Sequence, residues 1–114
     1  MKEVIDVGLP PLKQPFSWAV KAPLHHSSML FTAHGPVRPD GSIATGSVSE
    51  QARLTFTNLR QAVHAAGGTM ADVTQVLIYM TDVQDMAAID AVYREFSEPP
   101  YPNRSSAAVA ALVV

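Results

Sequence analysis

The stretch from Ser47 to Gly68 constrains the fold most, because it encodes one helix together with both of its ends. Ser47 and Glu50 form a capping-box pattern, in which the Ser47 hydroxyl accepts from the amide of Glu50 and the Glu50 carboxylate reaches back. Gly67-Gly68 supplies the left-handed residue that ends many helices. Between these ends, apolar residues recur at the alternating spacing of one helical face, at Ala52, Phe56, Leu59, Val63 and Ala66. The sequence therefore predicts a long helix with one buried face.

Segments rich in β-branched or aromatic residues surround this helix and have the length of strands. We predict strands over residues 16–20, 28–33, 73–80 and 106–114, with a brief extra strand around Ile43 and a turn at 24–27. Prolines 10, 11 and 15 keep the first segment extended or irregular. A second helix follows Asp85, which is placed to cap it, and its apolar face comprises Met86, Ile89, Tyr93 and Phe96.

This order of elements predicts one α+β domain over residues 1–114, since 114 residues supply a single core. Two helices cover only one face of a mixed sheet, so the other face is free for a partner subunit. The composition agrees, because 47% of the residues are hydrophobic and only 16% are charged, where about a quarter is usual. We therefore expect apolar surface to be buried between copies of the chain.

Charge and composition also argue against several classes of function. The net charge is −2 and the basic residues are scattered, which does not suit a phosphate backbone, so we expect no nucleic-acid partner. No run approaches the roughly 20 apolar residues of a membrane span, so we expect no membrane partner. The chain has no cysteine, which is compatible with the cytoplasm. His25-His26 has no third ligand spaced nearby, so we expect no metal.

With the elements placed, the order and spacing of several motifs resemble the RidA/YjgF family of reactive-intermediate (enamine/imine) deaminases over nearly the whole chain. Residues 15–20 (PFSWAV) are similar to the family's opening Pro-Tyr-Ser-x-Ala-Val, and residues 30–35 to its strand that ends in Ser-Gly. Residues 102–105 (PNRS) match its Pro-x-Arg-Ser signature. Further matches on the two helices are Gln51, Asn58-Leu59, Tyr93 and Phe96. The resemblance implies a chorismate-mutase-like α+β fold, a homotrimer with sites at subunit interfaces, and no cofactor.

The family's activity, carried over by this resemblance, is hydrolysis of 2-imino and enamine acids to a keto acid and ammonia. Arg104 then acts as the catalytic and substrate-binding residue, since a planar guanidinium can grip a carboxylate with two parallel hydrogen bonds. Gly35 and Ser106 supply further polar contacts to the substrate. The aromatic residues Phe16, Trp18 and Tyr101 either line the pocket or belong to ordinary packing.

Three residues depart from the family pattern. Phe16 replaces a Tyr and removes a phenolic hydroxyl, although it keeps its place in the substrate pocket. His34 replaces a Ser, and it is either the general acid or base of the pocket or a hydrogen-bonded residue at a strand end. Asp90 stands at a frequent Asn position among the substrate-binding residues. Phe16 and His34, together with the absence of the family's C-terminal Glu, favour the alternative of a non-catalytic member that binds a small carboxylate or carbonyl compound.

The chain ends at Val114, where the family continues into a final strand that carries a Glu. Either the sequence stops short of that strand or this variant lacks it. An RNA-cleaving member of the family is disfavoured by the net charge and by the lack of interleaved basic and aromatic residues.

Overall fold

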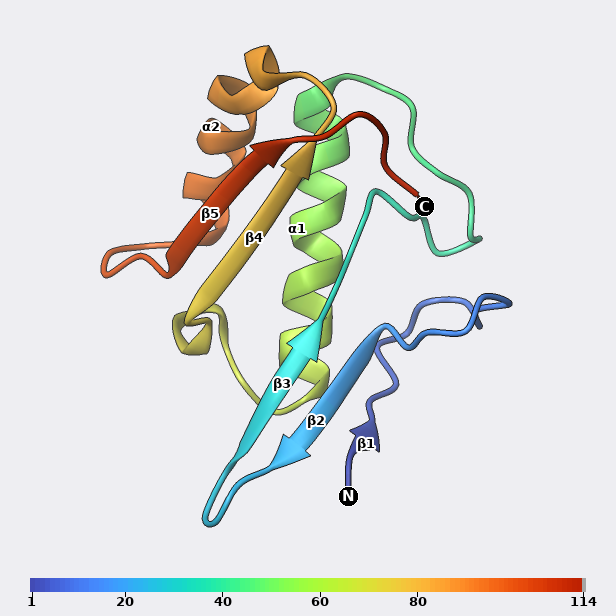
Figure 1. The fold of residues 1–114 in the computed structure, drawn as a ribbon, viewed down its shortest axis with the longest axis vertical. Helices are drawn as coiled ribbons and strands as arrows, with labels where there is room; N and C mark the ends of the chain where they lie inside the picture. The colour runs from blue at the N-terminus through green and yellow to red at the C-terminus, as the bar shows by residue number, and fades with distance from the viewer. Residues whose placement is uncertain (114) are drawn as a thin grey trace.

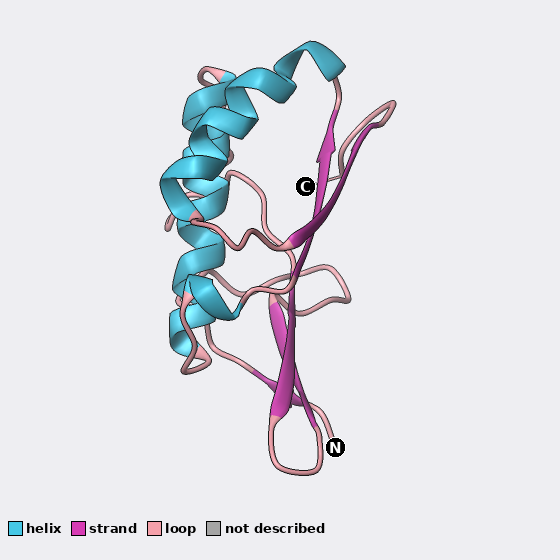
Figure 2. Ribbon diagram, turned by 90° about the vertical axis from the view of Figure 1, so that its left-hand side faces the viewer, coloured by secondary structure: helices cyan, strands magenta, loops and turns pink. Residues whose placement is uncertain are grey.

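Helices and strands form two layers in the computed structural model, which describes residues 1–113. The helices lie on one side of the strands, as the edge-on view in Figure 2 shows. In chain order the elements are β1 (Glu3–Val4), β2 (Ala19–Pro23), β3 (Ser28–Thr32), α1 (Val48–Ala65), η1 (Met70–Asp72), β4 (Gln75–Met80), η2 (Val83–Asp85), α2 (Met86–Phe96) and β5 (Asn103–Ala108) (Figure 1). The predicted α+β class, with both helices on one face, is confirmed.

The strands run in both directions, as predicted, but they hydrogen-bond in two separate groups. β1, β2 and β3 form an antiparallel sheet in that order, while β4 and β5 form a parallel pair. The parallel pair depends on α2, which carries the chain from the end of β4 back to the start of β5. Within residues 1–113, therefore, β3 and β4 each keep one edge without a neighbouring strand.

Several predicted strand positions are wrong in detail. The first hairpin strand is Ala19–Pro23 rather than 16–20, because all five of its residues pair with β3, from Ala19 opposite Thr32 to Pro23 opposite Ser28. The predicted strand at Ile43 is a single bridge to Val37, which closes the turn between them. The last strand begins at Asn103 and ends at Ala108, because these six residues match the length of β4. Of the predicted range 106–114, residue 114 lies outside the described residues.

The long helix follows the sequence prediction closely. The Ser47 hydroxyl accepts from the Glu50 amide at 3.2 Å, and Gly67 takes the left-handed conformation, with φ of 89°, just after α1. The Glu50 carboxylate lies against Gly46. The predicted Asp85 cap is wrong, because the Asp85 side chain forms no cap hydrogen bond, whereas Asp82 accepts from the Gln84 amide at 2.9 Å.

The buried side chains form two clusters. The larger one lies between α1, α2 and β4 and comprises Ala52, Phe56, Met80, Ile89, Val92 and Tyr93. The smaller one joins the N-terminal segment and β2 to the second half of α1, and comprises Val7, Ala19 and Ala62. Most residues of the two predicted helical faces are buried or packed against the larger cluster, so the helical periodicity identified the core correctly.

The strand face opposite the helices is apolar and bare. On β4, Val76 and Ile78 pack against the larger cluster while Leu77 and Tyr79 are 55% and 56% exposed. On β3, Met29 and Phe31 are 47% and 59% exposed in the same alternating manner. This face matches the expected bare face, and its burial against a partner subunit stays a prediction.

Candidate functional site

Arg104 is positioned by the pairing of β5 with β4. Arg104 lies opposite Val76 in the parallel register, and Val76 packs toward the helices. Residues that pair in adjacent strands point to the same face, so the Arg104 side chain also points toward the helix layer. There it meets α2, the helix that connects the two strands.

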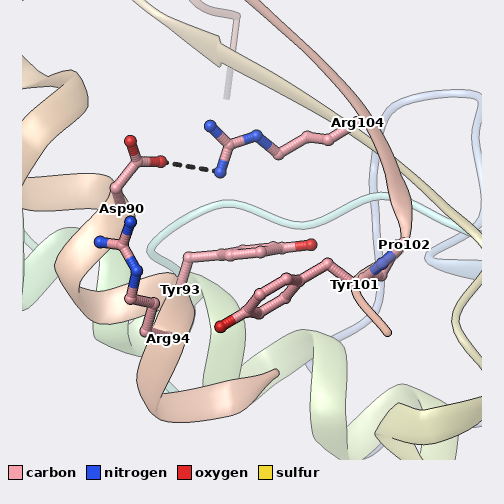
Figure 3. A pocket seen from close by; sticks show the side chains of 6 residues that line it. All are labelled: Asp90, Tyr93, Arg94, Tyr101, Pro102 and Arg104. Atoms are coloured by element: carbon pink, nitrogen blue, oxygen red, sulfur yellow. Dashed lines mark ion pairs between the residues drawn. The ribbon is translucent and has the colours of Figure 1, made fainter. Parts of the chain in front are cut away.

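Arg104 contacts a carboxylate and an aromatic ring on successive turns of α2. Its Nη1 lies 2.7 Å from Oδ1 of Asp90, and the two side chains are only 25% and 30% exposed. Its Cζ lies 5.0 Å from the centroid of the Tyr93 ring, a cation–π contact that holds the guanidinium beside the ring. Figure 3 shows the Tyr93 ring between the guanidinium and the Tyr101 ring, whose centroid is 6.1 Å away.

These residues line an open pocket of about 220 Å³, together with Arg94 and Pro102. The pocket holds two guanidinium groups and one carboxylate, so it can receive a small molecule that carries charge. Arg94 is exposed to solvent, whereas Asp90 and Arg104 are half-buried. Charge–charge interactions are stronger in the less hydrated part of the pocket, so the Asp90–Arg104 pair dominates its electrostatics.

The contact between Asp90 and Arg104 is an ion pair without hydrogen-bond alignment. Oδ1 of Asp90 is shielded from solvent and accepts no hydrogen bond from residues 1–113, despite the short distance to Nη1. The Tyr93 hydroxyl is also buried and without a partner in this part of the chain. Buried polar atoms are usually satisfied, so two unsatisfied ones beside the same pocket distinguish it from an ordinary surface ion pair.

His34 lies just after β3 and is neutral. Its Nε2 is 2.5 Å from the Thr32 hydroxyl, and its ring stacks on Trp18 with centroids 6.1 Å apart and 5° between the planes. The Thr32 hydroxyl donates its proton to the Trp18 carbonyl, so Nε2 must carry the hydrogen of the imidazole and Nδ1 keeps its lone pair. Burial lowers the pKa of His34 to about 4.

This environment bears on both interpretations of His34. The imidazole is hydrogen-bonded at a strand end, and with a pKa of about 4 it is the neutral ring, not the imidazolium, at pH 7. Its Nδ1 is buried and has no hydrogen-bond partner among the described residues. At pH 7 the buried Nδ1 is a hydrogen-bond acceptor, and the role of His34 as general acid or base of the pocket stays a prediction.

The other predicted site residues, Phe16, Gly35 and Ser106, do not line the Arg104 pocket. Phe16 is exposed, meets the Trp18 ring edge-on at 5.8 Å between centroids, and lines a second open pocket of about 240 Å³. The Gly35 carbonyl accepts from Asn58 of α1 at 3.2 Å. Ser106 is exposed two residues after Arg104 on the same strand, and so on the same face.

Four of the predicted residues, with two aromatic neighbours, thus form two groups that do not share a pocket within residues 1–113. One group, the Arg104 half, comprises Arg104, Asp90 and Tyr93; the other, the His34 half, comprises Phe16, Trp18 and His34. Sequence reasoning missed Arg94 as a pocket residue and treated Tyr93 only as part of a buried face. The signal was present, since Asp90, Tyr93 and Arg94 have the three- and four-residue spacing of one helix side.

No three side chains able to hold a metal ion gather within the described part of the chain. The His25 and His26 rings contact each other in the β2–β3 turn, with centroids 4.0 Å apart. Among residues 1–113, no helix has both the length and the apolar character that a membrane crossing requires.

A charged pocket between a parallel strand pair and its connecting helix, on an α+β fold, agrees with the family that the motifs indicated. The family model described as Endoribonuclease L-PSP matches residues 10–114. The chain therefore belongs to this family, which includes the RidA/YjgF-type reactive-intermediate deaminases.

Relatives of known name support the same assignment. A 2-iminobutanoate/2-iminopropanoate deaminase from Dermatophagoides farinae is 39% identical over 112 residues, which are 97% of this chain and 86% of the relative. Protein mmf2, mitochondrial, from Schizosaccharomyces pombe is 33% identical over 94 residues, 82% of this chain and 71% of the relative. The crystal structure of E. coli TdcF with bound serine superposes with a TM-score of 0.81 at 32% identity, covering 96% of this chain and 87% of TdcF.

Proposed function

We propose that this protein hydrolyses reactive 2-imino and enamine acids to a keto acid and ammonia, with Arg104 holding the substrate carboxylate. The observation that carries the proposal is the half-buried guanidinium of Arg104 in an open pocket, held by a contact with the Tyr93 ring. A fixed planar guanidinium suits two parallel hydrogen bonds to a carboxylate. The names of the Dermatophagoides relative and of TdcF, a putative reactive intermediate deaminase, support this chemistry.

The proposed reaction does not require a strongly acidic or basic side chain. Water adds to the imine carbon and its oxygen becomes the carbonyl oxygen of the keto acid. The carbon–nitrogen bond breaks, and the nitrogen takes both protons of the water and leaves as ammonia. Imines react readily with water, so fixing the substrate and stabilising its charge can accelerate the reaction. His34 is neutral at pH 7 and therefore contributes by accepting a hydrogen bond, from the attacking water or from the substrate nitrogen.

We further propose that the complete site forms between subunits of a homotrimer. The bare face of β3 and β4 supplies the apolar surface for such an assembly. Within one chain, Arg104 and His34 lie in separate groups, so contact between neighbouring copies would bring the Arg104 half of one to the His34 half of the next. Sedimentation velocity tests this: a trimer that Tyr79→Glu converts to monomers is expected, and a monomeric unmodified protein contradicts the assembly.

The alternative function is a non-catalytic member that binds a small carboxylate or carbonyl compound. Two observations favour it: Phe16 lacks the hydroxyl of the family's Tyr, and the low pKa of His34 leaves it as the neutral imidazole, not the acidic imidazolium, at neutral pH. We also propose a cytoplasmic location for the protein. The relative mmf2 is named as mitochondrial, so imaging of a fluorescent fusion is needed to distinguish the two locations.

The decay of freshly generated 2-iminobutanoate separates the two functions. We expect the protein to accelerate ammonia release over buffer, and Arg104→Ala to lower kcat/KM by about 100-fold, because it removes charge-assisted hydrogen bonds to the substrate. Arg53→Ala is the matched control, since Arg53 pairs with Glu95 on the exposed helix surface outside the pocket. Equal rates for the unmodified protein, Arg104→Ala and buffer would leave only ligand binding.

A further inference from the structure

We propose that Asp90 and Arg104 together select small zwitterions, in which a carboxylate stands next to a positively charged nitrogen, over simple monocarboxylates. This inference rests on the proposed function, because it specifies the charge state of the substrate that the same pocket takes. Asp90 is the specificity-determining residue and Arg104 the anchor.

The first step is the unsatisfied carboxylate. Oδ1 of Asp90 is shielded from solvent and accepts no hydrogen bond within the described chain, although Nη1 of Arg104 lies 2.7 Å away. The ion pair occupies this oxygen and Nη1, but the side chains of Arg104 and Asp90 are still 25% and 30% exposed, so their remaining polar atoms are available to a ligand. A ligand that offers both an N–H donor and a carboxylate would satisfy Asp90 and Arg104 together.

The second step is the cost of a ligand with only a negative charge. A bare carboxylate that binds Arg104 must lie close to Asp90, and two like charges in a poorly hydrated place repel each other. Arg94 brings a second positive charge to the pocket, but it is exposed and its charge is screened by solvent. The repulsion by Asp90 therefore acts against monocarboxylates, while a neighbouring ammonium or iminium group removes it.

The third step concerns the ring beside the pair. Tyr93 lies one turn from Asp90 on α2, and its face is 5.0 Å from Cζ of Arg104. The face of an aromatic ring carries partial negative charge and attracts cations. Asp90 and Tyr93 thus favour a cation on one side of the pocket, and Arg104 favours an anion next to it.

The charges of the pocket match the substrate of the proposed reaction better than its product. A protonated 2-imino acid carries an iminium nitrogen next to its carboxylate, whereas the keto acid carries the carboxylate alone. Water and the iminium acid give the keto acid and ammonium, so the positive charge leaves with the nitrogen. The pocket then holds the substrate more tightly than the product, which assists product release. Serine, the molecule in the TdcF crystal structure, carries the same two charges.

Isothermal titration with a matched pair of ligands tests the inference. 2-Aminobutanoate carries both charges, and butanoate differs from it by the missing ammonium group. We expect the unmodified protein to bind 2-aminobutanoate about tenfold more tightly, a difference of about 1.4 kcal/mol. Asp90→Asn should abolish this preference by strengthening butanoate binding and weakening 2-aminobutanoate binding, whereas Asp90→Glu should retain a preference.

Asp85→Asn is the control, because Asp85 lies just before the same helix and its side chain forms no cap hydrogen bond. If Asp90→Asn keeps the preference of the unmodified protein while imino acids are still hydrolysed, the inference is wrong and the proposed function stands. If the unmodified protein binds neither ligand and does not accelerate imine decay, the inference and the proposed function both fail.

Discussion

The two halves of the candidate site are held in place by different forces. The Arg104 half rests on the larger core cluster, since Tyr93 is part of that cluster and its ring meets Phe56 with centroids 5.6 Å apart. The His34 half lies near the smaller cluster, where side-chain hydrogen bonds to backbone carbonyls connect distant segments. Packing therefore fixes the Arg104 half, and hydrogen bonds fix the His34 half.

The polar contacts come mainly from α1 and its end. Asn58 donates to the carbonyls of Gly35 and Val37 at 3.2 and 2.8 Å, and Gln61 donates to the carbonyl of Val7 at 2.6 Å. Lys21 of β2 donates to the carbonyl of Ala66 at 2.9 Å. An irregular loop has few partners for its own backbone groups, so such side chains replace the hydrogen bonds that a sheet would supply.

The largest expected effect is a loss of stability in the Arg104 half, which is fixed by packing. Phe56→Ala removes a buried ring between α1 and α2, and it should lower the free energy of unfolding by about 3–5 kcal/mol. Urea denaturation followed by circular dichroism measures this loss. Leu24→Ala, in the exposed turn between β2 and β3, is the control and should change little. A loss below about 1 kcal/mol for Phe56→Ala would mean that packing does not fix this half.

A smaller loss is expected in the half fixed by hydrogen bonds. Asn58→Ala leaves the Gly35 and Val37 carbonyls without their donor and should cost about 1–3 kcal/mol. Amide hydrogen exchange should accelerate in residues 35–44 but not in α2. Uniform acceleration throughout the chain would show instead that the two halves unfold together.

The third prediction concerns pH. The His34 pKa is about 4 in the folded chain and has its ordinary value near 6.5 when unfolded. Between these values the unfolded state binds the extra proton, so the contribution of His34 to stability is lost as pH falls from 6.5 toward 4. When the pH is lowered from 7.5 to 4.5, the free energy of unfolding, measured by urea denaturation, should fall by about 2 kcal/mol more in the unmodified protein than in His34→Gln. Parallel losses in the two proteins would show that His34 titrates normally.

The smallest effect is expected on the outer surface of the helix layer. Arg53 and Glu95 join α1 to α2 with atoms 3.0 Å apart, but both side chains are about half exposed, at 49% and 50%. Solvent and salt screen such pairs, so Arg53→Ala should leave the urea midpoint unchanged at physiological ionic strength. A clear shift would show that this pair, and not Phe56 alone, holds the helices together.

The sequence predicted the helices better than the strands. The Ser47 cap, the buried helical face and the Gly67 end depend on neighbouring residues, so they can be recognised locally. The limits of β2 and β5 depend on the length of the strand beside each one, which no local pattern encodes. The bridge at Ile43 looked like a strand because one β-branched residue follows a turn, yet only Val37 pairs with it.

The identities of several residues of the candidate site could be predicted from the sequence, but their arrangement in space could not. The Pro-x-Arg-Ser motif identified Arg104, and the family's Asn position identified Asp90; the structure brings these two together. The neutral state of His34 depends on its burial between Thr32 and Trp18, which sequence spacing does not reveal. The separation of the Arg104 and His34 halves likewise follows from tertiary structure alone.

One helix serves both halves of the site. Phe56 and Asn58 are two residues apart on α1, and they point to the Tyr93 ring and to the Gly35 loop respectively. Each residue of an α-helix advances by 1.5 Å and turns by about 100°, so these two side chains keep a fixed offset in height and direction. A one-residue insertion or deletion within α1 would therefore misplace one half relative to the other, even with every site residue intact.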